Sequence, residues 1–275
     1  MTMALDTLIR APIGHVNFSV CDLATATQSI IDGAQAISGG PGKAVLFWNA
    51  YNVALASDNA DYATLSDSAS AVFCDGVPVV WAGRRLHPDV LGWSRVYGPD
   101  TMCAVLDQGR AVSLRHYLLG SDEQTLAALT TAITERWPGV ELVGVESPPF
   151  RPPTADELLA RDKRISESGA QCVWVGLGTP RQDTECLRLA DALSITALGV
   201  GAAFDFIAGT KRQAPVALQR SGLEWAFRLA SEPRRLTRRY LWGNPRFVRE
   251  VFRQTRVQST VRSSERRNRG DVGNE

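Results

Sequence analysis

The sequence predicts an α/β protein whose mostly parallel sheet is flanked by helices and followed by a basic, helical C-terminal appendage. Short apolar, β-branched runs alternate with longer amphipathic stretches, which is typical of βαβ units. Glycines and single polar residues follow several of these runs. Arginines concentrate near the end of the chain, where the pattern becomes helical and aromatic.

Six runs have the length and composition of buried strands: residues 44–50, 71–75, 112–120, 140–145, 171–178 and 195–201. Two helices between them have recognisable first turns, because Ser121 with Gln124 and Thr154 with Glu157 fit the capping box. In such a sheet, ligands bind at the carboxyl ends of the strands. The residues expected at that edge are Asn49, Asp75, Gly120, residues 176–182 and residues 199–205.

A change of composition near residue 222 predicts three parts: an α/β core at 1–222, a basic amphipathic appendage at 223–258, and a disordered tail at 259–275. The sequence GNP at 243–245 predicts a helix break, with Asn244 as N-cap and Pro245 at the first helical position. One face of the following helix is apolar and another is basic, as in helices that lie on anionic bilayers. These faces comprise Phe247, Val248, Val251 and Phe252, and Arg246, Arg249, Arg253 and Arg256.

Charge is distributed unevenly along the chain. The net charge is +1, yet residues 228–269 hold 13 arginines against three glutamates, which leaves the rest of the chain acidic. A basic segment on an acidic body predicts an anionic partner, either a membrane surface or a nucleic acid. Five scattered cysteines and the lack of a signal-like or membrane-spanning apolar run predict a cytoplasmic protein.

Several common enzyme signatures are missing from the sequence. There is no G-x-S-x-G elbow, no phosphate-binding G-x-x-x-x-G-K-[ST] loop, no H-E-x-x-H and no D-x-D pair. GVGAAF at 199–204 has two glycines of a dinucleotide fingerprint and comes late in the chain, so we expect no redox cofactor. His15, His87 and His116 have no spaced metal partners, so we interpret them as structural and expect no metal.

Glycine clusters at three strand ends favour a crevice for a nucleotide or sugar phosphate. In VGLGTPRQ, Gly176 and Gly178 allow close backbone approach, and Pro180 can start a helix whose N-terminus binds phosphate. The alternative for each cluster is a tight turn without a ligand. Gln182 and Asp183 could bond sugar hydroxyls, or could lie in a solvated first turn.

Four polar residues have two interpretations each. Asp75, in VFCDGVPVVWA, makes a turn or does chemistry, and Arg95 clamps a diphosphate or forms a surface ion pair. Asn49 orients a hydroxyl or opens a helix through an Asx turn. Asp205 binds a ligand hydroxyl or a neighbouring arginine, and the structural role is favoured.

The motifs, taken together, carry a resemblance to a known family. They are Asn49, CDGVPVVWAGRRL (74–86), RVYGPD (95–100), LLGSDE (118–123), VGLGTPRQD (175–183), GVGAAFDFIAGTKRQAP (199–215) and GLEWAFRLASEPRRLTRRY (222–240). Their order over residues 14–240 resembles the WecG/TagA/CpsF family of bacterial glycosyltransferases, glycosyltransferase family 26. The last two motifs are long and specific.

This resemblance implies a Rossmann-like core that needs no metal or other cofactor. It implies inverting transfer of a sugar, often of the N-acetylmannosamine type, from a UDP-sugar to a polyprenyl-diphosphate-linked acceptor in cell-envelope or exopolysaccharide synthesis. The reaction would occur at the inner membrane face, where the appendage docks and helps to complete the active site. Phe47 replaces a threonine common in the family, and P-R-Q-D replaces P-x-Q-E, so the donor sugar is open.

The resemblance also implies roles for single residues. Asp75 matches the catalytic base, Asn49 and Gln182 match the sugar pocket, and Arg95 matches a diphosphate contact. Further substrate-side positions are Gly76, Gly120, Gly178, Gly201 and Asp205. On the membrane or acceptor side, the expected residues are Arg212, Arg234 and Arg238.

Two rival functions remain at this point. The arginine-rich segment could bind nucleic acid, which would make binding steeply salt-dependent. Alternatively, the chain could be a nonenzymatic module of an envelope-assembly complex. The retained Asp75, Asn49, Arg95 and Gln182 favour an enzyme that binds no nucleic acid, and self-association into a homo-oligomer stays open.

Overall fold

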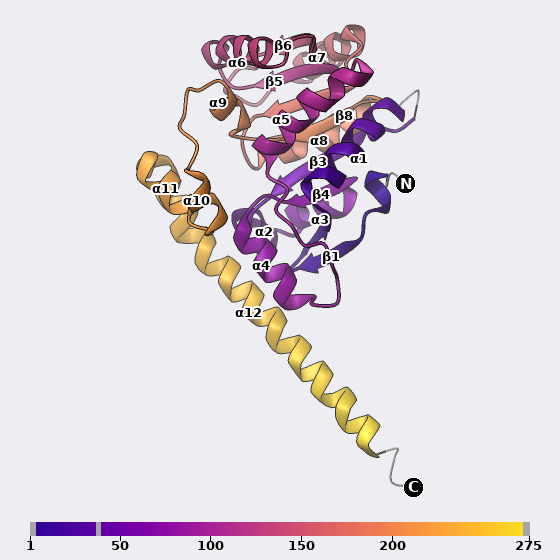
Figure 1. Cartoon of the computed structure of the whole chain (residues 1–275), viewed down its shortest axis with the longest axis vertical. Coiled ribbons are helices and arrows are strands. Elements are labelled where there is room, and N and C mark those ends of the chain that lie inside the picture. Colours follow the sequence, from indigo (N-terminus) through magenta and orange to yellow (C-terminus); the bar gives the residue numbers. More distant parts are fainter. Residues whose placement is uncertain (1–3, 37–39, 272–275) are drawn as a thin grey trace.

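The computed structural model of the chain describes residues 4–36 and 40–271. Its centre is a six-stranded parallel sheet with the order β4-β3-β8-β7-β5-β6 (Figure 1). The strands are β3 (Lys43–Trp48), β4 (Ala71–Cys74), β5 (Arg115–Gly120), β6 (Glu141–Glu146), β7 (Cys172–Gly176) and β8 (Thr196–Gly199). Each of the six predicted strands is present, and the α/β fold with a Rossmann-like parallel sheet is confirmed.

Helices cover both faces of the sheet, because alternate strand residues are buried on opposite sides. In β3, Leu46 and Trp48 pack on one side and Val45 and Phe47 on the other. The first side holds α2 (Ala50–Asp58), α3 (Ala60–Ser68), α4 (Val77–Leu86), α7 (Ala155–Ser168) and α8 (Arg181–Ala192). The second holds α1 (Leu23–Ala36), α5 (Gly98–Gln108), α6 (Glu123–Arg136) and α9 (Ala203–Ile207).

One of the two predicted helix starts is confirmed. Thr154 Oγ1 accepts from the Glu157 N–H at 3.3 Å, and the Glu157 carboxylate accepts from the Thr154 N–H at 2.8 Å, which forms the capping box of α7. The start of α6 was predicted one residue too early. Asp122 is its N-cap and accepts from the Thr125 N–H at 2.7 Å. Ser121 has a φ of 61°, so it belongs to the turn that leaves β5.

A short N-terminal hairpin was not predicted from the sequence. Strands β1 (Arg10–Ile13) and β2 (Val16–Ser19) pair antiparallel after the short helix η1 (Leu5–Thr7). Gly14 has a φ of 61° at the turn, and its N–H donates to Gln254 Oε1 at 2.8 Å. Gln254 Nε2 also donates to the Pro12 carbonyl at 3.1 Å. The hairpin therefore supports the C-terminal helix. Its strands have only four residues each, which is too short for a clear pattern of alternating apolar residues.

The chain ends in three helices: α10 (Val216–Arg220) at the end of the predicted core, then α11 (Glu224–Ser231) and a long helix, α12 (Pro233–Asp271), that runs along the core and then beyond it (Figure 1). The predicted break at Asn244 and Pro245 is wrong, because α12 is continuous with Pro245 inside it. A proline removes one backbone hydrogen bond and crowds the preceding turn. Packing compensates, since Leu236 and Phe247 on either side of the proline are both buried.

The disordered tail predicted from residue 259 also differs from the structure, in which α12 continues to Asp271. Residues 272–275 lie outside the described part of the chain. Among the described residues, no helix combines the length and apolar character needed to span a bilayer.

The apolar face predicted for the C-terminal helix is divided between core and surface. Phe247 is buried against the core cluster, and Val251 packs beside it. Val248, Phe252 and Leu241 remain exposed. The same helix therefore serves both as a structural element of the core and as a carrier of exposed apolar side chains.

This division predicts different effects for two phenylalanines on α12. Phe247 is 6% exposed, whereas Phe252 is 63% exposed. Phe247→Ala should lower the free energy of unfolding by about 3 kcal/mol, because it leaves a cavity between helix and core. Phe252→Ala should change it by about 0.5 kcal/mol or less. Urea denaturation measures both, and equal effects would contradict the docked position of α12.

Candidate active site

A cavity of about 300 Å³ lies at the carboxyl ends of the strands, and we call it the strand-end cavity. Residues that follow all six strands line it: Asn49, Asp75, Ser121, Phe150, Gly178 and Gly201. Appendage residues form another wall. The position agrees with the expectation that ligands bind at this edge of a parallel sheet.

Asp75 follows β4 directly and borders this cavity. Its N–H donates to the Trp48 carbonyl at 3.0 Å, which continues the strand pairing, and Oδ1 accepts from the Gly98 N–H at 2.9 Å at the start of α5. Oδ2 makes no hydrogen bond with any residue in the described ranges. Burial raises the pKa of the carboxyl, against the opposing effects of Arg95 and the Gly98 N–H. Asp75 thus has the geometry and proton affinity of a general base.

Three arginines of the appendage line the same cavity: Arg228 from α11, and Arg235 and Arg239 from α12. We call them the arginine wall. The Nε atoms of Arg228 and Arg239 are buried and have no hydrogen-bond partner in the described part of the chain. Burial, together with the nearby cations Arg228 and Arg235, lowers the pKa of Arg239. Arg235 is paired with Glu232, to which its Nε and Nη2 donate at 2.7 and 2.8 Å, so Arg228 and Arg239 are the two members with free Nε atoms that fit an anionic ligand.

The arginines predicted from the sequence for the membrane or acceptor side were Arg212, Arg234 and Arg238. Arg238 lines a neighbouring cavity with Arg235 and Arg239, while Arg212 and Arg234 are exposed and line none of the described cavities. Adjacent arginines in the sequence face different sides of a helix. The pairs Arg234–Arg238 and Arg235–Arg239 have the same four-residue spacing, so each pair shares a helix face and the sequence alone does not show which pair faces the cavity.

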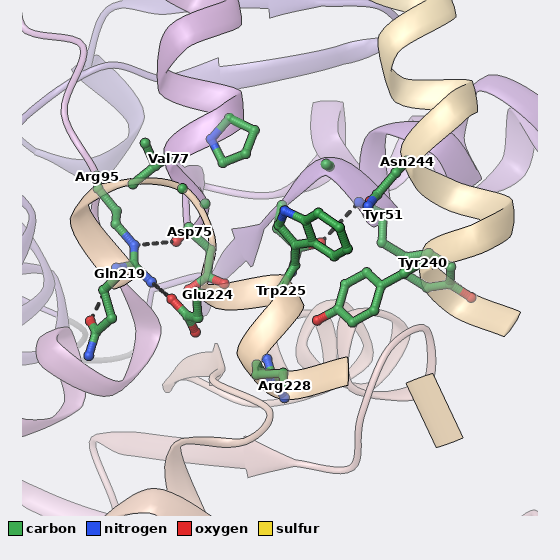
Figure 2. A pocket seen from close by; sticks show the side chains of 15 residues that line it. Tyr51, Asp75, Val77, Arg95, Gln219, Glu224, Trp225, Arg228, Tyr240 and Asn244 are labelled. Carbon is green, nitrogen blue, oxygen red and sulfur yellow. Dashed lines mark hydrogen bonds and ion pairs between the residues drawn. The ribbon is translucent and has the colours of Figure 1, made fainter. Parts of the chain in front are cut away.

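Arg95 borders a second cavity, between α4 and α11, that also reaches Asp75 (Figure 2). Nε of Arg95 donates to the Asp75 carbonyl at 2.8 Å, Nη1 donates to Gln219 Oε1 at 3.2 Å, and Nη2 forms an ion pair with Glu224. The guanidinium is therefore held by protein groups. An ion pair was one of the two alternatives for Arg95, but the observed pair is largely buried rather than at the surface, and Arg95 still lines the cavity.

Asn49 caps a helix, which is one of its two predicted roles, and it also lies at the cavities. Its Oδ1 accepts from the Tyr51 N–H at 3.0 Å, and its own N–H donates to Asn52 Oδ1 at 3.0 Å, so it caps α2. It also lines both cavities beside Asp75, and its Nδ2 donates to no described residue. Gly76 lines the second cavity, and a Cβ there would lie 3.3 Å from the Asn49 Cβ. The glycine thus preserves the position of Asn49.

Gln182 connects two of the glycine loops rather than pointing a free amide into the cavity. Its Oε1 accepts from the Gly178 N–H at 3.1 Å and its Nε2 donates to the Gly199 carbonyl at 3.0 Å. A Cβ on Gly201 would lie 3.4 Å from Gln182 Oε1. Gln182 therefore has a structural role in addition to lining the strand-end cavity, and Gly178 keeps open space around its Cα.

Two other predicted ligand positions also have structural partners. A Cβ on Gly120 would lie 2.6 Å from the Gly176 backbone, so this glycine permits close strand packing. The Asp205 carboxylate lies 2.8 Å from Lys211 Nζ and accepts from the Thr210 hydroxyl at 3.4 Å. Asp205 and Lys211 line the strand-end cavity as a paired group.

Comparison with known protein families identifies the chain. The model of the glycosyl transferase WecG/TagA/CpsF family matches residues 11–261. The chain belongs to the WecG/TagA/CpsF family. The match extends over the core, the arginine wall and most of α12, so both sides of the strand-end cavity lie within the family's shared region.

In this glycosyltransferase, Asp183 has neither of the roles predicted for it. The carboxylate is fully buried, and it accepts from Trp48 Nε1 at 3.0 Å and from the Tyr62 hydroxyl at 2.7 Å. Burial raises the pKa of Asp183 to about 6. The side chain joins α8 to β3 and α3 and lies behind the cavity. Across residues 4–36 and 40–271, no cluster of three or more His, Cys, Asp or Glu side chains could hold a metal ion.

The buried Asp183 predicts a pH-dependent stability. Because burial raises its pKa from 3.8 to about 6, the folded state binds the proton more tightly than the unfolded state. Its contribution is fully present below pH 3.8 and is lost as the pH rises through about 6. The loss amounts to about 3 kcal/mol. Asp183→Asn removes the titrating group and should flatten this dependence in denaturation curves between pH 4 and 6. Its amide oxygen can still accept from Trp48 Nε1, while the bond with the Tyr62 hydroxyl must reverse direction.

The exposed Asp191, on the same helix, provides the control. Asp191→Asn should leave the pH dependence of the glycosyltransferase unchanged. If Asp183→Asn retained the full wild-type slope between pH 4 and 6, the assignment of a raised pKa to Asp183 would be wrong.

Proposed function

We propose that this glycosyltransferase moves a sugar from a UDP-sugar donor, with inversion, to a polyprenyl-diphosphate-linked acceptor. One observation carries the proposal: Asp75 and the arginine wall border a single cavity at the carboxyl edge of the sheet. Direct displacement at an anomeric carbon needs a base for the acceptor hydroxyl and positive charge for the departing diphosphate. The cavity offers both without a direct bond between them.

The donor diphosphate would bind against Arg228, Arg235 and Arg239. Buried, unpartnered Nε atoms on two of these residues support this orientation, because an anion would satisfy them. Gly178 leaves open space for a ligand near the start of α8, although its own N–H and carbonyl are bonded to Gln182. Phe150 is exposed at the cavity, where its ring could contact the uracil base.

Transfer would proceed in one displacement. Asp75 Oδ2 takes the proton of the acceptor hydroxyl while the hydroxyl oxygen forms a bond to the anomeric carbon. The bond between that carbon and the β-phosphate oxygen breaks, and its electron pair leaves with UDP. The arginine wall stabilises the charge that develops on the leaving group. Three guanidinium groups supply this charge, so we propose that transfer requires no metal.

The acceptor would be presented by the inner face of the membrane. Leu241, Val248 and Phe252 form an exposed apolar stripe on α12, and Arg249 and Arg256 lie on the same helix. Apolar side chains interleaved with arginines suit a peripheral helix on an anionic bilayer. An N-acetylmannosamine-type sugar or a related hexose or uronic acid is the donor we propose, for cell-envelope or exopolysaccharide synthesis.

The rival functions make different use of the arginines. Nucleic acid would need solvent-facing cations, which α12 has in Arg249 and Arg253, but it would leave unexplained the buried Nε atoms of Arg228 and Arg239, which fit a small anion inside the cavity. A nonenzymatic assembly module would not need a carboxylate with a raised pKa and a free oxygen. Both features favour the enzyme.

Asp75→Asn tests the proposed base. Asparagine keeps the hydrogen bond from Gly98 and the shape of the side chain but cannot take a proton. We expect transfer to fall by a factor on the order of 10²–10⁴ with the dissociation constant of UDP unchanged. A UDP-sugar panel with a short-chain lipid-diphosphate acceptor, read by mass spectrometry, measures turnover, and calorimetry measures UDP binding.

Asp191→Asn, far from the cavity, should keep wild-type turnover. Near-normal turnover by the Asp75→Asn variant would remove Asp75 from the mechanism. Because burial raises the pKa of Asp75, the acidic limb of the wild-type kcat/KM profile should lie above the range of an ordinary aspartate.

Glutamate substitutions in the apolar stripe test membrane binding. Leu241→Glu and Phe252→Glu place a charge where an apolar side chain would enter the bilayer. Each should weaken flotation with phosphatidylglycerol vesicles by about tenfold or more. Truncation after Gly222 is less informative, because it also removes the buried Leu236 and Phe247.

Leu159→Glu provides the matched control, since Leu159 is equally exposed but lies on α7 in the core. It should float like the wild type. If the α12 substitutions float as well as this control, the stripe does not bind membrane.

A further inference from the structure

Arg95 links three separate segments next to Asp75. Its guanidinium uses Nε for the Asp75 carbonyl after β4, Nη1 for Gln219 on α10, and Nη2 for Glu224 on α11. Both ion-pair side chains are largely buried, at 17% and 15% exposure. A planar guanidinium is suited to this, because its donors point in fixed directions that a lysine cannot reproduce.

Glu224 makes a second contact with the core through Tyr97. The Tyr97 hydroxyl donates to Glu224 Oε1 at 2.8 Å, and the Arg95 guanidinium stacks on the Tyr97 ring with a distance of 3.7 Å to the centroid. The next residue is Gly98, whose N–H donates to Asp75 Oδ1. Glu224 therefore contacts Arg95, which bonds the backbone carbonyl of Asp75, and Tyr97, which directly precedes the Gly98 N–H that bonds the carboxylate.

The same contacts also determine where part of the arginine wall lies. Glu224 and Arg228 are four residues apart on α11 and so share one helix face. Glu224 fixes the first turn of α11 to the core, and Arg228 then reaches the strand-end cavity from the next turn. Both Glu224 oxygens are occupied, which leaves Asp75 Oδ2 as the available base.

We propose that Glu224 is a positioning residue, which locks α11 onto Arg95 and Tyr97 and so holds Arg228 and Asp75 in the arrangement that transfer requires. The proposal rests on the proposed function for its consequence in catalysis. Its structural half concerns the docking of α11 and stands independently. The two halves therefore need separate measurements.

The first experiment needs no substrate. In the full-length Glu224→Gln variant, the ion pair is lost while the side-chain shape is kept, so amide hydrogen exchange across residues 224–231 should accelerate. Glu224→Ala should accelerate it further, because the bond from Tyr97 is lost too. The control is Glu167→Gln, which breaks an exposed ion pair with Lys163 on α7 and should leave exchange in α11 unchanged. Unchanged exchange in both Glu224 variants would overturn the proposal.

The second experiment measures catalysis with the UDP-sugar donor and lipid-diphosphate acceptor. Glu224→Gln should lower kcat/KM by a factor on the order of 100, since misplaced catalytic groups cost about that much. Tyr97→Phe should have a smaller effect alone and none in the Glu224→Ala background, because the two side chains act through one contact. Additive losses in the double variant would contradict that coupling.

The pH profile separates positioning from a loss of stability alone. The charged groups that face Asp75 are Arg95, Glu224 and Arg228, with Tyr97 and Cys74 as neutral neighbours. Glu224 adds to the raised pKa of Asp75, below the larger effect of burial. Glu224→Gln removes the negative charge and hydrates the site, so the acidic limb of kcat/KM should move to lower pH. A variant that is merely less stable would keep the wild-type limb.

The outcomes also separate this proposal from the proposed function. If exchange in α11 is faster in the Glu224 variants but the wild type turns over no donor, the docking role of Glu224 stands and the transferase chemistry is rejected. Wild-type turnover with unchanged kcat/KM and an unshifted limb in Glu224→Gln would keep the transferase and overturn the positioning role.

Discussion

The structure depends on keeping a buried carboxylate close to several cations without letting it pair with them. A direct bond from an arginine to the free oxygen of Asp75 would lower the proton affinity that a base needs. The fold avoids this because Arg95 donates to the backbone carbonyl of Asp75 and forms its ion pair with Glu224 instead. The Gly98 N–H takes only one carboxylate oxygen, so burial remains the dominant influence on the pKa of Asp75.

Much of the sheet could be predicted because buried parallel strands consist of apolar runs whose ends are marked by glycine or polar residues. Asp75 and Asn49 could be located for the same reason, since each follows such a run directly. The partner of Arg95 could not, because Glu224 lies 129 residues further along the chain. The sequence shows that Arg95 carries a positive charge that needs an anionic partner, but the identity of that partner depends on the fold.

Other differences come from packing that a local pattern does not contain. Asp183 was expected in a solvated first turn, but α8 packs on β3 and α3, so that turn is buried and Trp48 and Tyr62 supply its partners. Among the paired arginines of α12, the rotation of the helix on the core decides which member faces the cavity. Buried apolar residues of the same helix, such as Leu236 and Phe247, fix that rotation by packing against the core.

The division of α12 between core and surface bears on how the site is assembled. The strand ends contribute Asp75 and the glycine loops, but the guanidinium groups of the arginine wall come from α11 and α12. The exposed stripe and the buried anchors Leu236 and Phe247 occupy one continuous helix through Pro245, and the same helix carries Arg235 and Arg239. The position of α12 on the core therefore determines where two of the three arginines lie relative to Asp75.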